Sequence, residues 1–149
     1  FKAILKTTLF AGLADITGAF IMSWVISKTS PDIVLKYIAS GVWGKDAFNG
    51  GYIIMSAGLL FHFIIAFACT AVYFYLYPRL KFLHKNTFIS ILLIAIVAWL
   101  VTTQVIVPLS KIGHRPLQLI PSLRAIAVLV ICIGTPIVLM TKNYYNNRN

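Results

Sequence analysis

The chain has 149 residues, of which 60% are hydrophobic and only 11% are charged. An average soluble domain carries about 25% charged residues, so this chain cannot cover a water-exposed surface, and we expect one membrane domain over residues 1–149. The net charge is +10, but the basic residues lie at the ends of apolar runs, which favours anionic lipid headgroups over nucleic acid as the partner.

The first apolar run predicts a membrane-spanning helix over about residues 7–26. Lys2 and Lys6 precede this run, and Lys28 follows it. At a rise of 1.5 Å per residue, a helix of this length covers roughly 30 Å, the thickness of the hydrocarbon core. We therefore expect this segment to cross the bilayer once.

The loop after the first span contains a second helical pattern, over about residues 31–43. Ser30, Pro31 and Asp32 are typical of a helix start, and Gly44 is a natural stop. Apolar residues recur at helical spacing, with polar residues on the opposite side. This run is too short and too polar to span a bilayer. We predict an amphipathic helix that lies at the membrane interface, with a re-entrant segment as the alternative.

Three further spans are predicted over about residues 52–77, 87–109 and 120–141. Pro136 predicts a kink in the last of these. The apolar runs are continuous rather than alternating, which disfavours strands. The predicted fold class is an all-α integral membrane protein with four transmembrane helices plus one short amphipathic interfacial helix in the first loop.

Four spans place the N-terminus, the second loop and the C-terminus on one side of the membrane. Seven basic residues lie on that side and six on the other, counting Arg124 as interfacial. The small excess favours termini in the cytoplasm. The two sets are Lys2, Lys6, Arg79, Lys81, Lys85, Lys142 and Arg148 against Lys28, Lys36, Lys45, Lys111, Arg115 and Arg124.

Asp15 and His62 each lie near the middle of a predicted span. An acid at the bilayer centre costs roughly 2.5–3.5 kcal/mol to insert, so Asp15 should face other helices rather than lipid. Gly12 and Gly18 share its helix face, and Gly58 shares the face of His62. Small residues let neighbouring helices approach closely, so we predict that these faces pack. We hypothesise a direct or water-bridged pair between Asp15 and His62.

This intramembrane polar pair admits two roles. A proton-linked or pH-sensing site is one, because histidine titrates near neutrality. A hydrogen bond that joins two helices is the other, and such bonds average about 0.6 kcal/mol in membranes. We favour the structural role.

Gln104 and Arg124 form a second predicted polar region, toward the loop between the third and fourth spans. Thr102 and Thr103 lie beside it. Arg124 is about one turn inside its helix, so its guanidinium can extend to the headgroups. The alternative is a partly buried binding site for an anion, a lipid headgroup or a carboxylate.

The sequence predicts no enzyme, metal or cofactor site. Cys69 and Cys132 lie inside apolar runs without metal-ligand spacing, which is typical of packing residues. His62 is the only histidine within a predicted span, whereas bis-histidine haem needs two on facing helices. No phosphate loop or nucleophile motif is present.

Four segments resemble a group of small bacterial inner-membrane proteins, the YagU-like proteins. The resemblance covers most of the chain, about residues 3–141. It implies a four-helix inner-membrane fold and a bacterial source, but it implies no activity and therefore no catalytic residue. The segments are AGLADITGAF, YIASGVWGKDAFNGG, LLFHFIIAF and IVPLS.

Two classes of function follow. We favour a non-enzymatic structural or accessory subunit of a membrane complex or homo-oligomer, because small-residue faces and little extramembrane mass suit such a role. The alternative is a small proton-coupled carrier or channel that uses Asp15 and His62. Four spans are few for a carrier, so the alternative needs a dimer or a larger assembly.

Overall fold

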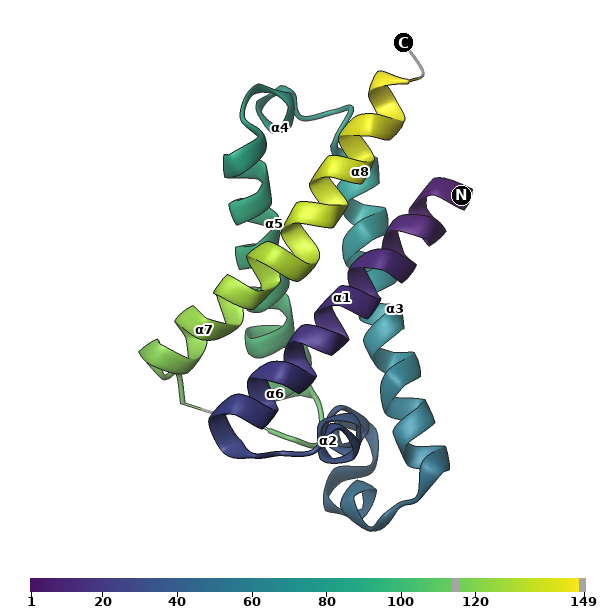
Figure 1. Cartoon of the computed structure of the whole chain (residues 1–149), viewed down its shortest axis with the longest axis vertical. Coiled ribbons are helices and arrows are strands. Elements are labelled where there is room, and N and C mark those ends of the chain that lie inside the picture. Colours follow the sequence, from purple (N-terminus) through teal and green to yellow (C-terminus); the bar gives the residue numbers. More distant parts are fainter. Residues whose placement is uncertain (114–115, 148–149) are drawn as a thin grey trace.

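The computed structural model describes residues 1–113 and 116–147, and this part of the chain is helical without a strand (Figure 1). Arg115 and Arg148 lie outside the described residues. Segment η1 is a 3₁₀ helix, and η2 and η3 are π-helical. The elements in chain order are α1 (Lys2–Ser27), α2 (Pro31–Trp43), η1 (Gly44–Asn49), α3 (Tyr52–Leu76), α4 (Lys81–Lys85), α5 (Thr87–Leu100), η2 (Val101–Ile106), α6 (Val107–Leu109), α7 (Leu119–Leu129), η3 (Val130–Gly134) and α8 (Thr135–Asn146).

Within the described residues, four helical stretches are long and apolar enough to cross a membrane, judged by length and composition. They are Lys2–Ser27, Tyr52–Leu76, Thr87–Leu109 and Leu119–Asn146, and they are consistent with a multi-pass membrane protein. The first begins earlier than predicted and the last ends later. A helix can continue through polar residues outside the membrane, because its backbone hydrogen bonds also form in water. A boundary predicted from hydropathy alone therefore falls short of the true end of such a helix.

The long helices place both termini and α4 at one end of the molecule, and α2 and η1 at the other (Figure 1). Helix α1 packs against α3 and also against α7, η3 and α8, while α5 packs against α7, η3 and α8. The apolar core extends from the middle of the bundle toward the end that holds the termini. Its buried residues are Ala11, Tyr73, Tyr77, Leu83, Ile94, Ala98, Ile133, Ile137 and Val138.

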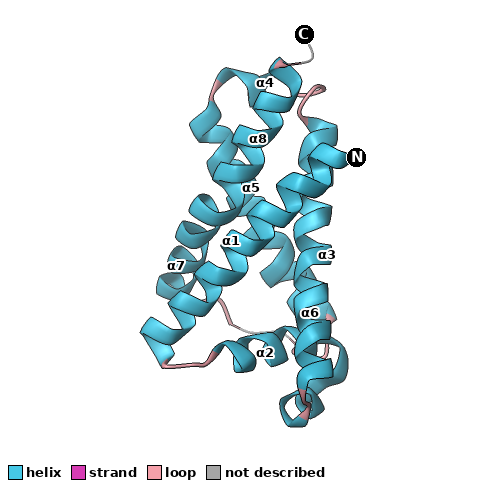
Figure 2. Ribbon diagram, turned by 45° about the vertical axis from the view of Figure 1, so that its right-hand side comes forward, coloured by secondary structure: helices cyan, strands magenta, loops and turns pink. Residues whose placement is uncertain are grey.

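Helix α2 has the predicted bounds and lies across the ends of the long helices (Figure 2). Its fully buried Ala39 marks the face that packs against α3. Gly58 of α3 is the contact point, because a Cβ there would collide with the carbonyl of Leu35 and lie 3.3 Å from the amide nitrogen of Ala39. Gly44, with a φ of 65°, ends the helix in a conformation that favours glycine.

Two of the long stretches contain a π-helical segment shortly before a proline. Segment η2 precedes Pro108, and η3 precedes Pro136. Proline has no N–H to donate, so nearby carbonyls need other donors. The backbone N–H and the hydroxyl of Thr135 both donate to the carbonyl oxygen of Val130, the hydroxyl at 2.8 Å. Such turns are common causes of helix bending.

Candidate functional site

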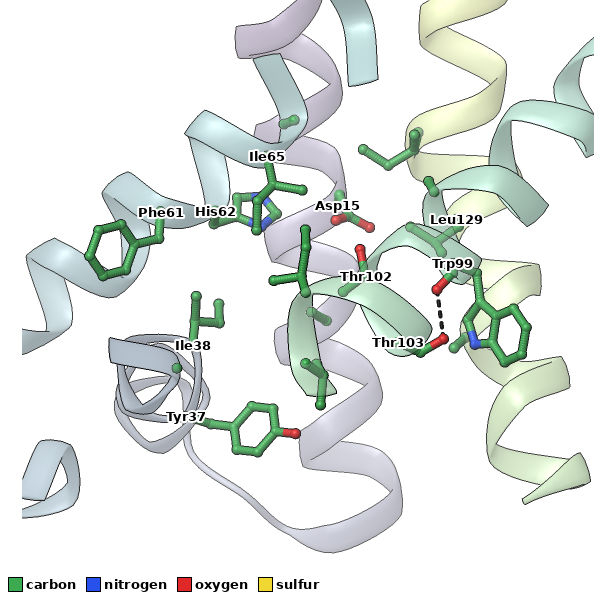
Figure 3. A pocket seen from close by; sticks show the side chains of 18 of the residues that line it. Asp15, Tyr37, Ile38, Phe61, His62, Ile65, Trp99, Thr102, Thr103 and Leu129 are labelled. Atoms are coloured by element: carbon green, nitrogen blue, oxygen red, sulfur yellow. Dashed lines mark hydrogen bonds between the residues drawn. The ribbon is translucent and has the colours of Figure 1, made fainter. Parts of the chain in front are cut away.

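A cavity of about 600 Å³ lies between α1, α2, α3, the α5–η2–α6 stretch and the α7–η3 stretch (Figure 3). Apolar side chains make up most of its wall. Eight residues with a polar or titratable side chain also line it, and these are Asp15, Ser23, Tyr37, His62, Cys69, Thr102, Thr103 and Ser110.

Asp15 contributes the carboxylate of the cavity. It lies near the middle of α1, on the side that packs within the protein, since Ala11 and Gly12 are buried whereas Leu13 is 56% exposed on the other side. The side chain itself is partly buried, and its oxygens are directed into the cavity (Figure 3). An acid that faces a cavity avoids the larger penalty of contact with lipid.

His62 reaches the same cavity from α3. Its Nε2 lies 2.9 Å from the carbonyl oxygen of Gly12. Because a carbonyl only accepts, Nε2 carries the proton of this bond, and in the neutral ring Nδ1 is then the acceptor. Gly12 precedes Asp15 by three residues, a rise of about 4.5 Å along the helix. The imidazole and the Asp15 carboxylate both line this cavity.

The structure therefore brings Asp15 and His62 to one cavity, but within the described residues no hydrogen bond joins them. The interhelical bond of His62 goes to the α1 backbone instead. A water-bridged pair between the two side chains stays a prediction. Of the two roles considered for the pair, holding helices together fits His62, whereas Asp15 has its oxygens toward open space.

The predicted packing glycines lie on both sides of Asp15. A Cβ on Gly12 would come within 2.6 Å of the Phe63 ring in α3. A Cβ on Gly18 would lie 3.0 Å from the sulfur of Cys132 and 3.1 Å from Val128. Each glycine thus lets another helix of the same chain approach α1, so the carboxylate lies between two close helix contacts.

The stretch from Ala98 to Ser110, at the end of the third span, lines the cavity at intervals of four residues, through Ala98, Thr102, Ile106 and Ser110. Trp99, Thr103 and Val107, each one residue after the first three of that series, also line it. Thr103 donates its hydroxyl to the carbonyl oxygen of Trp99 at 2.7 Å, the dashed line of Figure 3. Sequence reasoning placed the two threonines in a polar region but did not connect them to Asp15. Four of these seven residues are apolar, so their spacing alone does not mark a polar face.

Tyr37 is a second residue whose role the sequence analysis missed. It lies in the segment predicted as the short amphipathic helix, and its side chain lines the cavity from α2 (Figure 3). Nothing local in the sequence indicates this, because it depends on α2 lying beneath the long helices.

The second predicted polar region does not form one site in the described residues. Gln104 donates from Nε2 to the hydroxyl of Thr103 at 3.3 Å. Arg124 is exposed on α7 and is not part of the cavity wall, and no hydrogen bond joins it to Gln104 within the described part of the chain. An anion or lipid site at Arg124 stays a prediction.

The chemistry available in the cavity is binding and proton exchange. Among the described residues, no group of three or more histidine, cysteine or acidic side chains is arranged to hold a metal ion. The carboxyl of Asp15 can take up or release a proton, and the wall can accept an apolar molecule. Comparisons of the chain with protein-family models, with curated proteins and with solved structures found no match.

Proposed function

We propose that this protein is a small proton-linked membrane carrier that binds an apolar or amphipathic molecule in the cavity beside Asp15. The observation that carries the proposal is the cavity itself, which places an acid and a histidine from the middles of two long helices around about 600 Å³ of space. Sites for small molecules typically measure roughly 300–1,000 Å³ and are mostly apolar with a few polar groups.

The position of Asp15 supports proton linkage. A carboxylate inside a bilayer is costly, so it is neutralised by a proton or a partner. No hydrogen bond within the described residues neutralises it. A proton that the carboxyl gains and loses as the cavity fills and empties is therefore the simplest role for this acid.

The structural-subunit hypothesis rests on small-residue faces and on little extramembrane mass. The glycines of those faces, Gly12, Gly18 and Gly58, contact helices of the same chain. An accessory role in a membrane complex stays a prediction. Because four spans are few for a carrier, we propose that the working form is a homo-oligomer.

The proposal includes a placement in the membrane. We place the protein in a bacterial inner membrane as a relative of the YagU-like proteins, with both termini in the cytoplasm, on the basic residues and sequence segments given above. We place α2 at the membrane interface. The exposed Ile33, Val42 and Trp43 suit contact with lipid headgroups and the adjoining acyl chains.

Proton flux into liposomes under an imposed pH gradient, with a panel of cationic, anionic and neutral hydrophobic dyes in the lumen, tests the proposal. The wild type, Asp15→Asn and His62→Ala are purified, sized in detergent and reconstituted. Asp46→Asn is the matched control, because this exposed acid lies in η1, away from the cavity. We expect flux from the wild type and the control, and none from a correctly sized Asp15→Asn protein. Equal flux from Asp15→Asn, or none from any protein, contradicts the proposal.

A further inference from the structure

The charge in the cavity restricts what it can bind. Among the described residues that line it, Asp15 is the only one whose side chain is a carboxylate, and none is a lysine or an arginine. An anion entering this space would meet no fixed positive partner and would approach a carboxylate. A cation would meet its counter-ion at a depth where an unpaired charge is costly.

The titratable side chains around Asp15 do not change this sign. His62 and Cys69 come from α3, Tyr37 from α2, and Cys132 from η3. Cysteine and tyrosine are neutral near pH 7, and the Nε2 hydrogen bond of His62 goes to the carbonyl oxygen of Gly12 and not to the carboxylate. We take the imidazole as neutral in this proposal, which leaves Asp15 as the group that sets the electrostatic preference.

The rest of the wall suits a bulky apolar body. Aromatic residues contribute to the wall from three helices, with Tyr37 on α2, Phe61 on α3, whose ring also stacks on Trp43, and Trp99 on α5. The faces of such rings attract positive charge, and more strongly where water is excluded. An alkali cation would have to shed its hydration shell to enter a cavity whose wall is mostly apolar. An organic cation with delocalised or shielded charge loses little.

We propose that the ligand is a lipophilic organic cation with one positive charge, which exchanges with the proton of Asp15. This inference rests on the proposed function and names its substrate class. As the cation enters, the carboxyl of Asp15 releases its proton to solvent, and the carboxylate pairs with the ligand. As the cation leaves, one proton returns. The site is neutral in both states, so one cation moves against one proton.

Tetraphenylphosphonium and tetraphenylborate test the charge preference, because the two ions have nearly the same shape and opposite charge. Binding of each to the purified protein in detergent is measured by equilibrium dialysis, at several pH values. The proteins are the wild type, Asp15→Asn, Asp15→Glu and the control Asp46→Asn. Asp15→Glu keeps the carboxylate, so it separates loss of charge from loss of folding.

We expect the wild type, Asp15→Glu and Asp46→Asn to bind the phosphonium and prefer it to the borate. Asp15→Asn should bind the phosphonium at least about tenfold more weakly, since tenfold is about 1.4 kcal/mol of lost pairing. Affinity for the cation should fall as pH falls, because protons compete for the same carboxylate. Proton release on mixing, read with a pH dye, should approach one per cation bound where the acid is protonated.

Equal binding of the two ions by the wild type, or unchanged phosphonium binding by Asp15→Asn, overturns the cation proposal. These outcomes differ from failure of the proposed function. If proton flux depends on Asp15 while the cavity shows no charge preference, the carrier proposal stands and only the substrate class is wrong. If flux and binding are both absent from well-folded wild type, both proposals fail.

Discussion

Replacing Gly58 with alanine tests whether α2 is held against α3 by a backbone contact. In an open position of a helix, this change stabilises a protein by roughly 0.5–1 kcal/mol, because alanine is the better helix former. Here the new Cβ would collide with the carbonyl of Leu35 and crowd the backbone of Ala39. A backbone group cannot turn away as a flexible side chain can, so α2 must shift.

The magnitude follows from these opposing effects. Overpacking a well-packed contact costs about 1–3 kcal/mol, which exceeds the gain in helix propensity. We therefore expect Gly58→Ala to lower the free energy of unfolding by about 1–2 kcal/mol. The direction of the change in the free energy of unfolding is the decisive result, because helix propensity alone predicts that Gly58→Ala stabilises the protein.

Unfolding in mixed micelles, followed by circular dichroism as the fraction of denaturing detergent rises, measures the change. Ser56→Ala is the control, since Ser56 lies half a turn earlier in α3 and is exposed. The control should have a midpoint close to that of the wild type. A midpoint for Gly58→Ala at or above the wild-type value would show that α2 does not rest on α3 at this glycine.

Two other substitutions test separate contacts. Tyr145→Phe removes the hydroxyl that donates to the carbonyl oxygen of Phe74 at 3.0 Å and links α8 to α3. The free energy of unfolding should therefore fall by about 0.5–1.5 kcal/mol in the same assay. An unchanged value would mean that this hydrogen bond makes no net contribution to stability. At the start of α2, a hydrogen bond from Ser30 lowers the pKa of Asp32, and Ser30→Ala should raise that pKa, as read by carbon-13 NMR titration. A carboxyl with a lowered pKa adds stability above its unfolded-chain pKa, and this stability is lost as pH falls through its folded pKa. The free energies of unfolding of the wild type and Ser30→Ala should therefore differ near neutrality and converge in acid. A difference that stays constant with pH would contradict this cause.

The helices were predictable because their signals are local. Long apolar runs determine which segments can span a membrane, and the capping pattern at Ser30 and Pro31 set the start of α2 correctly. The inward direction of Asp15 was also predictable, since the cost of exposing an acid to lipid leaves one face of the helix for it. These arguments need only residues that are neighbours along the chain or around one turn.

The cavity was not predictable by these means, because its wall comes from segments far apart in the sequence. Asp15 and His62 were paired from the sequence only because each lies near the middle of its predicted span. A similar depth in the membrane does not distinguish two side chains in direct contact from two that line the same cavity. The bond from His62 to Gly12 depends on how close α3 approaches α1, which is a property of packing. The π-helical segments were also missed, although the kink expected at Pro136 pointed to one of them.

The position of α2 connects the fold to the proposed binding site. Tyr37 and Gly41 of α2 line the cavity at the end away from the buried core. The amide of Lys111 donates to the carbonyl oxygen of Gly41 at 2.9 Å, so the loop after the third span is tied to α2 as well. A helix that a composition argument assigns to the membrane surface thus also forms part of the wall around Asp15. Helix α2 is held at Gly58 by α3 and at Gly41 by this loop, and a shift of α2 would move Tyr37 and change the shape of the cavity. On the proposed placement of α2 at the membrane interface, such a shift would connect that interface to the occupancy of a site in the middle of the bundle.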